Sequence, residues 1–112
     1  MKPALPAMLG LAFSLVAGAA TATPVEVPWA KLTFLGGGWT TTTLRVQTSG
    51  AFSNPAACAM TDGYIVDSTL PGAQLLDSIL LTAYSTNQDV MLVIDGCVQS
   101  RPAVIGVYIR RS

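Results

Sequence analysis

The stretch LPGAQLLDSILLTAYSTNQDVMLVIDGC, residues 70–97, decides the fold. Its first part has apolar residues at helical spacing and predicts an amphipathic helix at about residues 70–86. Its second part, residues 89–94, is apolar on both faces, which is typical of a strand covered on both sides. The helix must therefore bury its apolar stripe against a sheet. The stripe consists of Leu75, Leu76, Ile79, Leu80, Ala83 and Tyr84.

Local signals mark the ends of these two elements. Ser68 and Thr69 lie where a helix cap belongs, and Pro71 is tolerated in a first helical turn. The pair Asp95-Gly96 predicts a turn at the end of the strand, and residues 99–102 are expected to form a polar loop.

Four further strands are predicted at residues 30–35, 39–48, 63–66 and 103–109. In the first, alternation places Leu32 and Phe34 on one face. Gly36 to Gly38 predict a hairpin turn or a sharply coiled strand. A phosphate-binding loop is disfavoured, because neither a Lys-Ser/Thr pair nor a helix follows the glycines.

The expected fold is mostly β (α+β), in the order β-β-β-α-β-β. This is the order of a five-stranded OB-like barrel, with the helix capping its open end, although other α+β sandwiches share it. The domain is expected to span residues 23–112. Residues 1–22 have the basic start, apolar centre and Ala20-Thr21-Ala22 exit of a secretory signal peptide. A membrane anchor is the alternative, but the apolar run is short for a span and contains Pro6.

Export places the two cysteines, Cys58 and Cys97, in an oxidising compartment, the periplasm or the exterior. Two cysteines in a small exported domain most often form one disulfide. Free thiols or a metal site are the alternatives. A metal site needs more ligands, and the chain contains no histidine.

The charges exclude several function classes. The chain has six Lys or Arg and six Asp or Glu, and it lacks the basic footprint of a nucleic-acid binder. No catalytic residues, cofactor or metal are expected, because the carboxylates are scattered and no histidine can act as a base. After signal cleavage, no membrane association is expected. Sugars stack on exposed aromatic rings, so Trp29, Trp39 and Tyr84 are the predicted ligand-binding residues, with core or rim packing as the alternative for each.

Three short runs resemble the B subunits of AB5 toxins of the subtilase-cytotoxin and typhoid-toxin type. These are Leu75-Leu76-Asp77, the helix-to-strand run of residues 83–90 (AYSTNQDV), and Ala57-Cys58-Ala59. The resemblance implies an OB fold, export, a ring of five subunits and glycan binding. In those subunits the cysteine before the third strand pairs with one in the second strand, which has none here. No glycan-binding residue is carried over.

Two functions are therefore expected. In the first, the protein is an exported binding module that recognises a cell-surface glycan, forms a homo-oligomer and pairs with an enzymatic A chain. In the second, it is a stand-alone periplasmic or secreted domain that binds or inhibits a partner protein and has no toxin role.

Overall fold

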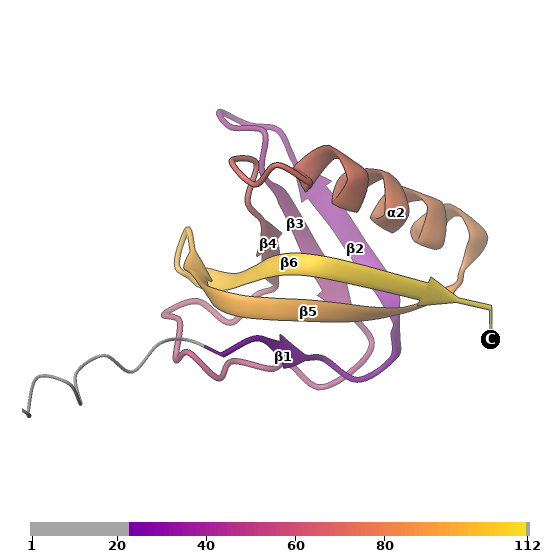
Figure 1. The fold of residues 1–112 in the computed structure, drawn as a ribbon, viewed down its shortest axis with the longest axis horizontal. Coiled ribbons are helices and arrows are strands. Elements are labelled where there is room, and N and C mark those ends of the chain that lie inside the picture. The colour runs from indigo at the N-terminus through magenta and orange to yellow at the C-terminus, as the bar shows by residue number, and fades with distance from the viewer. Residues whose placement is uncertain (1–22, 112) are drawn as a thin grey trace, which may run out of the picture.

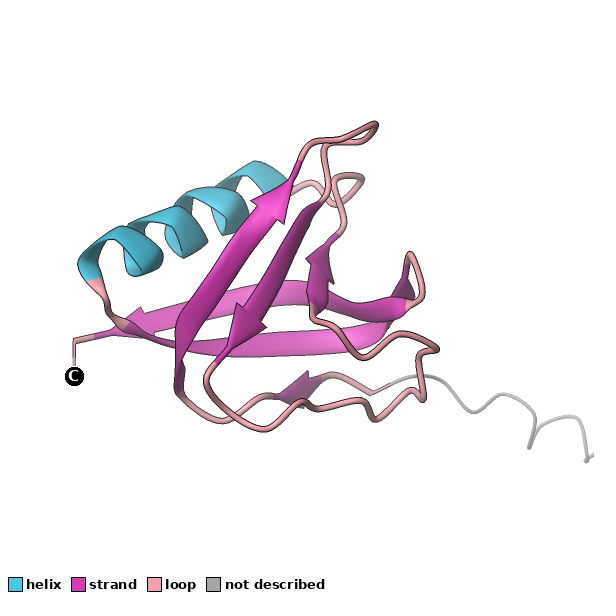
Figure 2. Cartoon of the chain, turned by 180° about the vertical axis from the view of Figure 1, so that it is seen from behind, coloured by secondary structure: helices cyan, strands magenta, loops and turns pink. Residues whose placement is uncertain are grey.

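The computed structural model describes residues 23–111, and the predicted leader, residues 1–22, lies outside them. Within the described range, six strands form one sheet and a single helix packs against it (Figures 1 and 2). The predicted mostly-β class and the order of the main elements are confirmed. The elements are β1 (Val25–Glu26), β2 (Ala30–Gly37), β3 (Leu44–Thr48), β4 (Tyr64–Val66), α2 (Ala73–Thr86), β5 (Asp89–Val98) and β6 (Arg101–Arg110).

The predicted count of five strands is wrong, because β1 adds a sixth. This two-residue strand precedes the predicted first strand and pairs with β5, where Val25 faces Ile94. Pro24 and Pro28 flank it and favour extended backbone, which is all that such a short pairing needs.

The other five strands pair in a closed cycle. β2 pairs with β3, β3 with β4, β4 with β6, β6 with β5, and β5 again with β2. Every pairing is antiparallel except that of β4 with β6. A parallel pair needs a long crossover connection, and here α2 and β5 supply it. The connection from β4 to β6 therefore contains the helix α2.

The helix α2 packs mainly on β6 and β2 and also contacts β4 and β5 (Figure 1). Leu76, Leu80 and Ala83 are buried as predicted. However, Leu75 is 65% exposed and Tyr84 is 48% exposed, so their assignment to the buried stripe is wrong. Because successive residues advance by about 100° around a helix, these two lie on opposite flanks of the narrower stripe that meets the sheet.

The helix starts three residues later than predicted. Gly72 is its N-cap and makes no side-chain capping bond, so the expected cap at Ser68 or Thr69 is wrong. Instead, the backbone N–H of Thr69 donates to Asp67 Oδ1 at 3.0 Å, which holds a turn ahead of the helix. The predicted end at Thr86 is confirmed, and Asn87 closes the helix in the left-handed conformation with φ of 55°.

Three register shifts interrupt the strand pairing, one between β2 and β3 and two between β5 and β6. The first lies between Leu32 and Phe34 in β2, and it turns Phe34 outward while Leu35 packs on the core. Of the two shifts between β5 and β6, one surrounds Gly96, which has φ of 70° and was predicted to form a turn. It forms a bulge inside β5. The actual hairpin turn is Gln99-Ser100, both at positive φ.

The disulfide between Cys58 and Cys97 is confirmed, with a Cα–Cα distance of 5.8 Å. It joins the long loop before β4 to the bulged end of β5. The largest fully buried side chains include Tyr64, Leu80 and Leu92, so strands and helix share one core. No helix among residues 23–111 has the length and apolar character needed to cross a bilayer.

Candidate functional site

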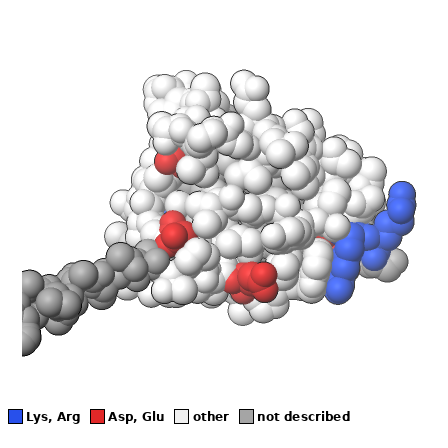
Figure 3. All heavy atoms as spheres, in the orientation of Figure 1, with Lys and Arg blue, Asp and Glu red and all other residues white. Residues whose placement is uncertain are grey.

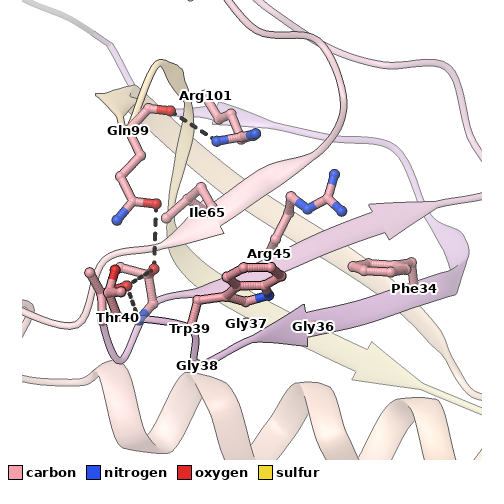
Figure 4. Close-up of a pocket in the computed structure, with 12 residues that line it drawn as sticks. Phe34, Gly36, Gly37, Gly38, Trp39, Thr40, Arg45, Ile65, Gln99 and Arg101 are labelled. Atoms are coloured by element: carbon pink, nitrogen blue, oxygen red, sulfur yellow. Dashed lines mark hydrogen bonds between the residues drawn. The ribbon is translucent and has the colours of Figure 1, made fainter.

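A hollow of about 480 Å³ opens beside the hairpin that joins β2 to β3. Segments far apart in sequence line it: the ends of β2 and β3, the middle of β4 and the turn between β5 and β6 (Figure 4). We call it the Trp39 cleft. Its lining residues are Phe34, Gly36, Gly37, Gly38, Trp39, Thr40, Thr41, Thr43, Arg45, Ile65, Gln99 and Arg101.

Trp39 is 96% exposed on the connecting loop, residues 38–43. The loop can turn sharply because Gly37 approaches the opposite strand closely, and any side chain there would overlap the carbonyl oxygen of Thr43. The hydroxyls of Thr41 and Thr43 lie 2.7 Å apart, and Thr43 also donates to Gln99 Oε1 at 3.4 Å. The exposed indole of Trp39 therefore belongs to the same hollow as several threonine hydroxyl groups and the side-chain amide of Gln99.

Two arginines on the cleft are held by one carboxylate. Arg101 donates from Nε to Asp62 Oδ1 at 2.6 Å and from its second guanidinium nitrogen to Oδ2 at 3.0 Å. Arg45 donates to the same Oδ2 at 3.0 Å and to the Asp62 carbonyl oxygen at 2.9 Å. The bidentate pair fixes the guanidinium plane of Arg101. Two bonds from one nitrogen anchor Arg45 to Asp62, so both side chains have a partner before any ligand arrives.

The arginines set the charge state of this cluster. The hydrogen bond from Arg101, together with the charges of both arginines, lowers the pKa of Asp62 below its ordinary value. The hydrogen bond to Asp62 in turn raises the pKa of Arg101. Both shifts favour the charged forms of Asp62 and Arg101, and one carboxylate faces two guanidinium groups.

Apolar groups form the rest of the cleft. Ile65 is 2% exposed, yet it lies on the face of β4 opposite the buried Tyr64 and outside the main core cluster. The Arg45 guanidinium lies 4.7 Å from the centre of the Phe34 ring, a cation–π contact. A ligand here would meet an exposed indole, fixed cations and short polar groups within one hollow.

The structure separates the three predicted ligand-binding residues. Trp39 lines the cleft, whereas Trp29 precedes β2 at the strand's other end. The Trp29 ring lies under the Arg110 guanidinium, 4.2 Å from its centre. Tyr84 is half-exposed on α2 and does not line the cleft. Of the three residues, only Trp39 lines the cleft.

Sequence reasoning missed Phe34, Arg45, Gln99 and Arg101 as cleft residues. They come from four separate segments, and only the closed strand pairing brings them together. The run Gly-Gly-Gly-Trp followed by four threonines points to Trp39 alone, and no local signal marks the other four residues. In the described part of the chain, no three metal-ligating side chains gather.

The chain matches no family model, no curated protein and no solved structure.

Proposed function

We propose that residues 23–112 form an exported OB-like binding module that recognises a glycan through the Trp39 cleft. As the sequence resemblance implies, the module is comparable to the B subunits of AB5 toxins. On this proposal a ring of such subunits presents several clefts to a cell surface, and an enzymatic A chain is the partner.

The strand pairing supports the OB-like part of the proposal. Five strands close a cycle with one parallel pair, β4 with β6, and one helix between the third and fourth of them. This connectivity supports assignment to the small Greek-key barrels that bind oligosaccharides and oligonucleotides. The disulfide supports export, because such bonds persist in oxidising compartments.

The exposure of Trp39 is the observation that carries the glycan proposal. A fully exposed indole loses apolar hydration when a sugar face stacks on it, and the hydroxyl and amide groups around it can exchange hydrogen bonds with sugar hydroxyls. Arg45 and Arg101 can donate to ring or substituent oxygens without reorienting, because Asp62 already holds them. Aromatic, donor and acceptor groups thus surround one hollow.

A glycan array with the mature protein tests this proposal. Reproducible hits are expected, with Trp39→Ala losing them and Trp29→Ala retaining them as the matched tryptophan control. Both variants should keep the far-ultraviolet circular dichroism spectrum of the parent. Absence of hits for the parent, or equal loss in both variants, would reject the cleft as a glycan site.

A second candidate, a stand-alone protein-binding or inhibitor domain, is favoured by a different surface. Most of the face drawn in Figure 3 is uncharged, with separate acidic patches and with basic groups only at the end near the C-terminus. Strand β6 crosses this face (Figure 1), and its Ile105 and Tyr108 are 38% and 55% exposed. The mass in solution distinguishes the candidates, because a strict monomer at high concentration argues against a toxin-like ring.

A further inference from the structure

A second hollow, of about 300 Å³, lies on the other side of the β2–β3 hairpin, between that hairpin and α2. We call it the helix groove. Gly37, Gly38 and Thr43 line both hollows, so the hairpin is a shared wall. The remaining walls of the helix groove are mostly aliphatic: Leu35 from β2, Leu44 from β3 and Leu81 from α2.

One carboxylate interrupts this apolar lining. Asp77 is the only charged residue of α2, and it lies on the groove instead of the solvent-facing side of the helix. Its Oδ1 atom is buried and accepts no hydrogen bond from the described residues. A buried acceptor without a partner is destabilising. Among the described residues Asp95 Oδ1 is in the same state, but Asp95 does not line this groove. Asp62 and Asp89 each have two cationic partners.

The chemistry of the groove selects one class of occupant. We propose that the helix groove binds a small primary alkylammonium, with the aliphatic stem against Leu35, Leu44 and Leu81 and the cationic head at Asp77. Leu81 is 60% exposed, so an aliphatic stem can cover apolar surface that now faces water. The hollow is at the small end of ligand sites, which favours a short stem over a large ring system. This proposal is independent of glycan binding in the Trp39 cleft.

The proposal predicts a pH dependence of known sign. Burial raises the pKa of Asp77 above its ordinary value, and no other titratable side chain is among the groove's lining residues. A bound cation favours the ionised carboxylate and must lower that pKa. Affinity for the cation therefore rises as the pH increases through the pKa of Asp77, whereas affinity for a neutral analogue stays constant.

Amide and carboxyl NMR titrations with n-pentylammonium and with n-pentanol test the site. Saturable shifts confined to the groove, near Leu81 and Thr42, are expected, with at least five-fold tighter binding of the amine at neutral pH. Asp77→Asn should remove this preference, while Asp67→Asn, outside the groove, should keep it. The carboxyl resonance of Asp77 should titrate at lower pH when the amine is bound.

Several outcomes would overturn the proposal. Equal binding of amine and alcohol would mean that the carboxylate does not recognise the head group. Shifts spread over the whole surface would mean non-specific adsorption. Groove shifts that appear on concentrating the protein alone would assign the groove to a second copy of the chain. Because the preference must also disappear in the unmodified protein at low pH, the test does not depend on the folding of any variant.

Discussion

The two ends of β2 are built from the same kinds of side chain but leave different surfaces. Each end has a tryptophan, Trp29 or Trp39, and a carboxylate bound by two cations. At the first end Asp89 binds Lys31 at 3.0 Å and Arg110 at 3.5 Å. At the other end, Asp62 binds Arg45 and Arg101.

The difference lies in which aromatic ring the guanidinium covers. Arg110 lies over Trp29 itself, so that indole contributes to the structure. Arg45 lies over Phe34, which leaves Trp39 bare at 96% exposure. The same residue type at the two ends of one strand therefore has two roles. An ion-pair cluster next to an aromatic residue indicates a binding surface only where the cluster leaves that ring uncovered.

Removing the disulfide should have the largest effect on the difference between the two ends of β2. The bond joins Cys58 and Cys97, and both the loop that carries Asp62 and the hairpin that carries Gln99 and Arg101 extend from it. Replacing both cysteines by serine should lower the free energy of unfolding by about 2–5 kcal/mol. Urea unfolding followed by circular dichroism measures this loss, and reduction of the unmodified protein is the control.

The same variant should disturb the two ends unequally. Indole NMR signals should shift for Trp39 and stay in place for Trp29, because only the Trp39 end is connected to the bond through Asp62 and Arg101. Equal shifts at both indoles, or a loss of stability below about 1 kcal/mol, would contradict the assignment of the disulfide to the support of the cleft.

Replacing each tryptophan by alanine should separate the two roles in stability. Trp29→Ala removes a cation–π contact worth about 0.5–1 kcal/mol and some buried apolar area, so a loss of about 1–2 kcal/mol is expected. Trp39→Ala touches an exposed ring and should change stability by less than about 0.5 kcal/mol. Thermal unfolding of both variants at one pH measures the difference, and equal losses would remove the distinction between the ends.

Much of the fold could be predicted from the sequence because it depends on local periodicity. The end of the helix at Thr86, the start of β5 at Asp89 and the pairing of the two cysteines all follow from short-range pattern or composition. Two of the errors arise where the strand register shifts. The shift near Phe34 reverses the face expected for that side chain, and a bulge stands where a turn was predicted at Gly96. Neither irregularity alters the hydrophobic pattern.

The candidate site was less predictable because its contacts are long-range. Trp39 could be singled out from its glycine and threonine neighbours. The pairing of Asp62 with Arg101, however, joins residues 39 positions apart, and no local pattern indicates it. The orientation of both cleft arginines depends on that pairing, so the chemistry of the cleft follows from the closed strand cycle and not from any motif.

Acid should weaken the ion pairs of Asp62 and Asp89 at the two ends of β2. This is the smallest of the expected effects. Hydrogen bonds from Arg101 to Asp62 and from Lys31 to Asp89 lower the pKa of each carboxyl below its ordinary value of 3.8. A carboxyl with a lowered pKa in the folded state stabilises the protein above its unfolded-state pKa, and that contribution is lost as the pH falls through the folded-state value. The melting temperature should therefore decline below about pH 4.

Two substitutions test which carboxylate causes the decline of the melting temperature in acid. Asp62→Asn and Asp89→Asn should each flatten the acid limb of the melting temperature between about pH 4 and pH 2. The Asp89 side chain is 16% exposed and that of Asp62 is 43% exposed. Because solvent screens the more exposed pair more strongly, Asp89→Asn should flatten the curve more than Asp62→Asn. The reverse order would mean that the Trp39 end is the more rigid of the two. Its arginines would then act first in stabilising the fold and only second in binding a ligand.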